Sequence, residues 1–229
     1  MTVEKTFDST ADQKTWYRVG GISALVLGLA YIIIVALYSR VGAPPGGAEA
    51  WFKYLPGKTT IWWAILGLSV FTDFLFVPLA FALYLALKGI NRNAMLFGIA
   101  FVGLFVVLDL AVTWSHYAAM LVLYRNYAGA ADEVQRAGYL AAANYASAVL
   151  ASPLIVVYAI VTLSFGILVI GVVMLKGVFN KITAYLALAT GVLGFAALSG
   201  WGLAIILNAL FATVWILFVG YRLCRLAPE

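Results

Sequence analysis

The chain has 229 residues, of which 65% are hydrophobic and only 10% are charged, and its mean hydropathy is +1.04. These values exclude a soluble domain, because no polar surface could cover so much apolar area, and they predict a protein that crosses a membrane several times. The net charge of +5 comes from lysines and arginines at the ends of apolar segments, which argues against nucleic acid as a partner.

The N-terminal part of the sequence predicts a tail, one span and a loop. Residues 1–15 are polar and too short to fold alone, so we expect a mobile cytoplasmic tail followed by a single domain at 16–229. The first span is predicted at 19–38, and the loop at 39–58 is predicted to form a hairpin or short helix at the level of the lipid headgroups. One face of the first span could approach another helix closely because small residues recur there, at Gly20, Ala24 and Gly28.

The second and third spans are predicted at 59–87 and 94–124, joined by a short basic turn. Pro78 lies inside the second span, one turn after Phe74, whose carbonyl therefore loses its usual donor. We expect a kink at this point, next to Asp73.

The rest of the chain is predicted to contain one ambiguous stretch and three spans. Residues 125–151 are expected to form a surface or partly re-entrant helix on the outer side. Spans four, five and six follow at 154–175, 182–198 and 202–221. The predicted fold is therefore an all-α bundle of six transmembrane helices.

The positive charges predict that both termini are cytoplasmic, with nine lysines and arginines inside and five outside. An alternative layout makes 137–152 a short seventh span and places the N-terminus outside, with the same count of charges. We favour six spans because a span of about 16 residues is short for a bilayer.

Two aspartates, Asp73 and Asp109, lie near the middle of the second and third spans. An aspartate at the centre of a bilayer costs roughly 2.5 to 3.5 kcal/mol on insertion scales, so both should face the bundle interior or water. If the two spans are antiparallel neighbours, the carboxyl groups lie at similar depth, where they could share a proton or hold a cation between them.

Further polar residues extend from the two aspartates toward the outer side. Along the helices, Ser69 is one turn outside Asp73, Thr113 is one turn outside Asp109, and His116 is about 10 Å outside Asp109. Toward the cytoplasm the same helices are apolar, so the pattern predicts a polar cavity that opens outward. The candidate ligand-binding residues are Asp73, Asp109, Ser69, Thr113, His116 and Asn208, the last from the sixth span at a similar depth.

Neither a metal ion nor a cofactor is expected, and no catalytic residue is predicted, because one histidine leaves only oxygen ligands at different depths. Three functions remain open. The first is binding or transport of a proton, cation or small amine at the aspartates. The second is an accessory subunit of a larger membrane complex, in which neutral carboxyl groups brace the helices. The third is a lipid-modifying enzyme using an aspartate and His116, which the separation of about 10 Å disfavours. Expected partners are membrane lipids, a small cationic ligand and other membrane subunits.

A family resemblance rests on three short segments. Phe165 and Gly166 lie in a span that continues through Gly171 into the basic loop at 176–182, and the second span ends at 82–88 with Ala-Leu-Tyr-Leu-Ala-Leu-Lys. These segments resemble an uncharacterised bacterial family of six-span membrane proteins, classed as a domain of unknown function. In that family the loop usually has a proline where this sequence has Asn180. The resemblance implies a protein of the bacterial inner membrane and transfers no catalytic residues.

Overall fold

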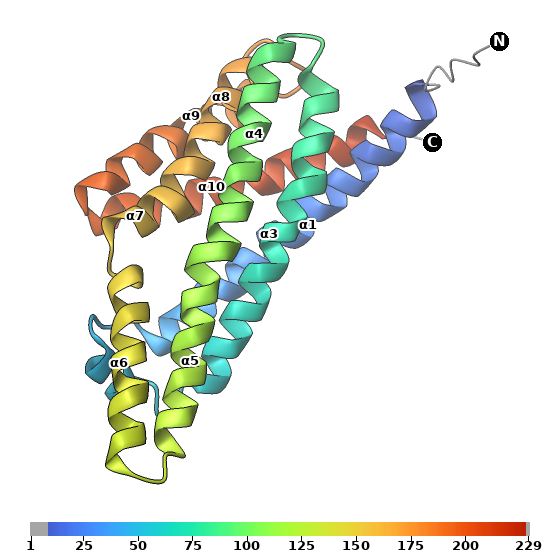
Figure 1. Ribbon diagram of the computed structural model, residues 1–229. Coiled ribbons are helices and arrows are strands. Elements are labelled where there is room, and N and C mark those ends of the chain that lie inside the picture. The colour runs from blue at the N-terminus through green and yellow to red at the C-terminus, as the bar shows by residue number, and fades with distance from the viewer. Residues whose placement is uncertain (1–8, 228–229) are drawn as a thin grey trace, which may run out of the picture.

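The computed structural model describes residues 9–227, which fold into helices joined by short connections (Figure 1). Six helical stretches within this part of the chain are long and apolar enough to cross a membrane, which confirms the predicted all-α, six-span bundle. The elements in chain order are α1 (Ser9–Val41), α2 (Ala48–Tyr54), α3 (Thr59–Leu87), α4 (Arg92–Leu108), the π-helical segment η1 (Asp109–Trp114), α5 (Ser115–Ala128), α6 (Glu133–Leu150), α7 (Pro153–Val156), the π-helical segment η2 (Val157–Val161), α8 (Thr162–Met174), α9 (Lys181–Ala196), the 3-10 turn η3 (Ala197–Ser199) and α10 (Gly202–Leu226).

The first helix begins earlier than the sequence predicts. Residues 9–15, assigned to a tail, are the start of α1, because this polar stretch contains no proline or glycine that would end the helix. The rest of the predicted tail, residues 1–8, lies outside the described residues.

The small residues of α1 allow close contact with two other helices. A Cβ atom at Gly20 would collide with Ala82 of α3, and one at Gly28 would lie 2.5 Å from Leu217 of α10. The helix α1 packs against both α3 and α10, so the predicted narrow face serves packing inside this chain.

Polar side chains at the helix starts explain several boundaries. The side chain of Asn91 accepts a hydrogen bond from the backbone at the start of α4, and that of Asp132 does the same for α6. Asn180 caps α9 in the same way, accepting from the backbone N–H of Thr183 at 2.8 Å. Asn180 therefore marks the start of the fifth span.

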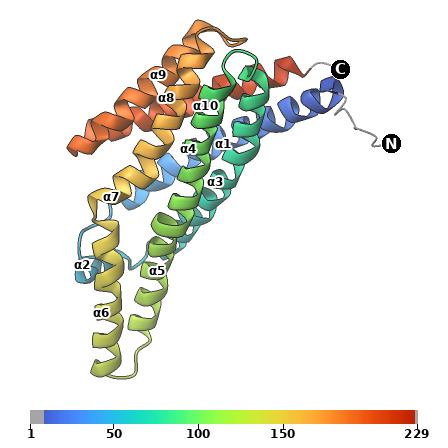
Figure 2. The same ribbon diagram turned by 45° about the horizontal axis from the view of Figure 1, so that its top comes forward.

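The third span is longer than a bilayer requires. It runs over 37 residues, from Arg92 to Ala128, or about 55 Å at 1.5 Å per residue, against about 30 Å of hydrocarbon. Its far part, α5, runs beside α6 at the end of the molecule remote from both termini (Figure 1 and Figure 2). There α2 packs on α6, and Ser147 of α6 accepts from the backbone N–H of Gly47 at 2.9 Å.

Two apolar cores fill the bundle on either side of the middle of α3. The core nearer the termini includes Phe76, Met95 and Trp215. The core at the remote end includes Trp51 and Trp62, both nearly inaccessible to solvent. The two aspartates lie between these cores.

Candidate functional site

The structure brings Asp73 and Asp109 together in the interior of the bundle. Asp73 is at the midpoint of the 29-residue helix α3, and Asp109 is the first residue of η1. These two elements pack against each other, and the carboxyl groups are close enough for their charges to interact. Asp73 is 2% exposed and Asp109 is 4% exposed. We refer to these residues as the aspartate pair.

The aspartate pair lies at a local change in helix geometry. The third span has π-helical hydrogen bonding from Asp109 to Trp114, a feature that often occurs at functional sites. Bonds of the i to i+5 type place Trp114 on the side of Asp109, and its indole is a neighbour of both carboxyl groups. The segment also contacts the second π-helical segment, η2, in the fourth span. The helix α3, in contrast, runs without interruption through Pro78.

Four buried polar atoms at this place make no hydrogen bond of good geometry: Asp73 Oδ2, Asp109 Oδ1, Thr113 Oγ1 and Trp114 Nε1. The Thr113 hydroxyl and the Trp114 indole nevertheless lie close enough to the carboxyl groups to interact with them. Within the described residues only one other buried side-chain atom, Trp215 Nε1, shares this condition. A buried polar group without a partner costs about 1 to 3 kcal/mol. The chain therefore carries an energetic cost at the aspartate pair that its own side chains offset only in part.

The side of the aspartate pair that faces α2, which the sequence predicts to be the outer side, is packed with aromatic rings. Tyr117 stacks on Trp62 with a centroid distance of 5.3 Å and an interplanar angle of 19°, and it also contacts Trp114 at 5.6 Å. Trp51 of α2 packs on Trp62 at 5.4 Å, and the Trp62 indole donates to the Tyr54 hydroxyl at 3.2 Å. In this structure these bulky side chains lie where the sequence predicts an outward opening, and Trp51 and Trp62 are buried there.

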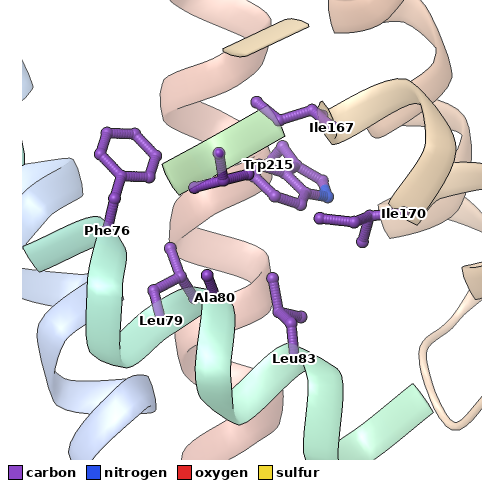
Figure 3. Close-up of a pocket in the computed structure, with 8 residues that line it drawn as sticks. Phe76, Leu79, Ala80, Leu83, Ile167, Ile170 and Trp215 are labelled. Atoms are coloured by element: carbon purple, nitrogen blue, oxygen red, sulfur yellow. The ribbon is translucent and has the colours of Figure 1, made fainter. Parts of the chain in front are cut away.

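The other side of the aspartate pair is apolar, as the sequence predicts. Figure 3 shows side chains of α3, α8 and α10 that point toward one another around a cavity of about 10 Å³, and the lining includes Phe76, Leu83, Ile167 and Trp215. A space of this size holds about one water-sized sphere. In this structure the aspartate pair is thus closed toward both ends of the bundle.

The other predicted site residues lie in different surroundings. Ser69 and Thr113 are buried in the same elements as the aspartate pair, 3% and 4% exposed. His116 instead bonds through Nδ1 to the carbonyl of Val112, at 2.6 Å, and its ring lies against Tyr145 of α6. The ring of His116 is therefore held by the backbone of its own span.

Asn208 belongs to a separate polar cluster in the interior. Its amide donates to the Ser164 hydroxyl of α8 at 3.0 Å and to the Thr190 carbonyl of α9 at 2.7 Å. Gly194 leaves no room for a side chain beside Ser164, so α9 lies close to this cluster. Asn208 therefore ties three helices together and does not join the aspartate pair.

Two residues near the aspartate pair were missed from the sequence. Trp114 lies on the same face of the third span as Asp109 only when the segment between them is π-helical. No signal in the sequence marks this change from α-helix to π-helix. Tyr31 of α1 lies within electrostatic reach of both carboxyl groups, and a tyrosine in the middle of an otherwise apolar span could have signalled this position.

These features define a six-span helical membrane protein with a closed acidic site between its second and third spans. Comparisons with family models, curated proteins and solved structures give no match to this chain. The resemblance to an uncharacterised six-span family therefore stays a prediction. Within the described residues no three side chains of histidine, cysteine, aspartate or glutamate gather into a potential metal site.

Proposed function

We propose that the protein binds a cation, either a proton or a small amine, at the aspartate pair and moves it across the membrane. The observation that carries this proposal is the gathering of four buried polar atoms without a well-formed hydrogen bond at Asp73 and Asp109. A permanent brace between helices would satisfy its own hydrogen bonds, as the amide of Asn208 does. Polar atoms left without partners are suited to a ligand that comes and goes.

Charge balance supports the choice of a cation. A buried carboxylate costs several kcal/mol unless a proton or a positive charge neutralises it. The elements that surround the aspartate pair have no lysine or arginine near it, since the basic residues of α1 and α10 are at their ends and α3 has none. The neutralising charge must then come from protons or from a ligand.

The aromatic neighbours support an amine as well as a proton. Trp114 and Tyr117 lie next to each other beside Asp109. Aromatic faces attract ammonium groups, with energies of about 2 kcal/mol or more where water is excluded. A small alkylammonium ion would therefore meet both carboxyl groups and aromatic rings at this position.

Entry of a ligand requires movement of the aromatic residues on the outer side. The short helix α2 carries Trp51 and lies between Gly47 and Gly57, which have φ values of 82° and 75°. Glycine adopts such values without strain, so these turns could let α2 move as a unit. We propose that α2 faces the outside and that the opposite, basic end faces the cytoplasm of a bacterial inner membrane.

The test is uptake into proteoliposomes that contain the purified full chain, with protons and methylammonium as separate probes. Wild-type protein should take up at least one probe, and Asp73→Asn or Asp109→Asn should reduce that uptake by about tenfold or more, because each removes an ionisable carboxyl group. Asp12→Asn is the matched control, since Asp12 is exposed near the start of α1.

Infrared difference spectra between low and high pH separate the outcomes. A carboxyl signal that is lost or shifted in each Asn variant and unchanged in Asp12→Asn would support binding at the aspartate pair. Wild-type liposomes without uptake, together with spectra that the two site variants leave unchanged, would refute the proposal. Loss of stability alone in these variants would instead favour the accessory-subunit hypothesis.

A further inference from the structure

The basic end of the bundle contains a cleft that is separate from the aspartate pair. It lies between the loop before α9 and the last turns of α10, and its volume is about 410 Å³. Arg222 and Arg225 line it together with Tyr221, Phe218, Val178 and Asn180. The lining thus combines two cationic groups with apolar and aromatic side chains, and none of its described residues is acidic.

Both arginines are held in position by contacts that leave hydrogen-bond donors unused. The Nε–H of Arg222 donates to the carbonyl of Val178 at 3.0 Å, so the terminal amino groups of its guanidinium remain for another acceptor. The guanidinium of Arg225 lies over the ring of Tyr221, 4.7 Å from its centroid. Within the described residues neither arginine forms an ion pair.

Two other polar groups of the cleft are already paired with each other. The side-chain oxygen of Asn180 accepts from both the backbone N–H and the hydroxyl of Thr183. The two arginines are the charged groups of the cleft. Two guanidinium groups without an anionic partner favour a phosphate, which accepts several hydrogen bonds from arginine at once.

The position and the apolar wall indicate which phosphate the cleft binds. The cleft is at the end of the sixth span, where a membrane protein meets the headgroup layer. Phe218 and Val178 are 40% and 43% exposed, and an acyl chain could cover them. We propose that this cleft binds an anionic phospholipid, with its phosphate at Arg222 and Arg225 and its acyl chain along Phe218.

Native mass spectrometry of the full chain in neutral detergent tests this site with phosphatidylglycerol and phosphatidylcholine of equal chain length. Wild-type protein should bind phosphatidylglycerol more tightly. Arg222→Gln and Arg225→Gln should each weaken that binding by about fivefold, because each basic residue near an anionic headgroup contributes about 1 kcal/mol. Arg92→Gln, at an exposed arginine of the same end and outside the cleft, is the matched control.

Several results would overturn the proposal. Equal affinity of wild-type protein for the two lipids would do so, as would a loss in Arg92→Gln equal to that in Arg225→Gln. Displacement of phosphatidylglycerol by the same concentration of inorganic phosphate would show a site for free phosphate instead. Because Arg225 makes no hydrogen bond within the described residues, its variant keeps the test valid even if Arg222→Gln disturbs the loop. The test does not involve the aspartate pair, so the two proposals can fail separately.

Discussion

Replacement of Asn208 by leucine should destabilise the bundle by an amount that its hydrogen bonds determine. Leucine branches at Cγ as asparagine does, so Asn208→Leu keeps the outline of the side chain and removes the amide. Two bonds to other helices are lost, one to Ser164 of α8 and one to Thr190 of α9. The change therefore tests the contribution of polar contacts rather than of side-chain volume.

The expected magnitude follows from measured values for such bonds in membranes. A hydrogen bond between transmembrane helices contributes about 0.6 kcal/mol on average and up to about 1.7 kcal/mol. Two bonds predict a loss of about 1 to 3 kcal/mol in the free energy of unfolding. The Thr190 carbonyl is inside helix α9, where it also accepts a hydrogen bond from the helix backbone. The variant therefore does not leave this carbonyl without a donor.

The assay is reversible unfolding of the purified protein in mixed detergent micelles. Ser164→Ala should lose about half as much as Asn208→Leu, and the double variant should lose no more than Asn208→Leu alone, because the two residues share one bond. Thr213→Val is the control, since its hydroxyl bonds only to the Ala209 carbonyl within α10. If Asn208→Leu were as stable as wild type, or if the two losses were additive, the described hydrogen bonds would not hold these helices together.

Two further substitutions test the packing of α1 and of α2. Gly20→Val should lower the free energy of unfolding by about 1 to 3 kcal/mol in the same assay, because a side chain there collides with Ala82. Gly67→Ala is the control and should lose no stability, since Gly67 has open space around it. Equal losses in the two variants would contradict the described packing. Ser147→Ala should speed hydrogen exchange at the Gly47 amide, because that amide loses its acceptor. Unchanged exchange there would show that the bond does not form.

The sequence predicts where helices end more reliably than how they face one another. The second span matches its predicted range because a lysine and a glycine flank it at each end, Gly57 and Lys58 before it and Lys88 and Gly89 after it. The first span was predicted too short, since a helix can continue beyond its apolar part when nothing breaks it. Hydropathy detects the membrane-crossing portion of a helix, and capping residues such as Asn180 determine its start.

The candidate site was predicted correctly in depth but not in the direction that each side chain faces. Counting residues along a helix gives depth, and depth correctly placed Asp73 near Asp109. It could not show that His116 faces α6 or that Asn208 faces α8, because the rotation of each helix depends on packing with helices distant in sequence. A π-helical segment adds to the difficulty, since it rotates Trp114 relative to ordinary helical spacing.

The two polar clusters of the interior provide the strongest argument for where function resides. Both are buried, yet the amide of Asn208 is bonded to two other helices, whereas each carboxyl group of the aspartate pair includes an atom without a well-formed hydrogen bond. A protein that required only packing at the aspartate pair could have leucine at these two positions and avoid that cost. Retaining two acidic groups there is consistent with a role that needs their charge, and the Asn variants separate this role from stability.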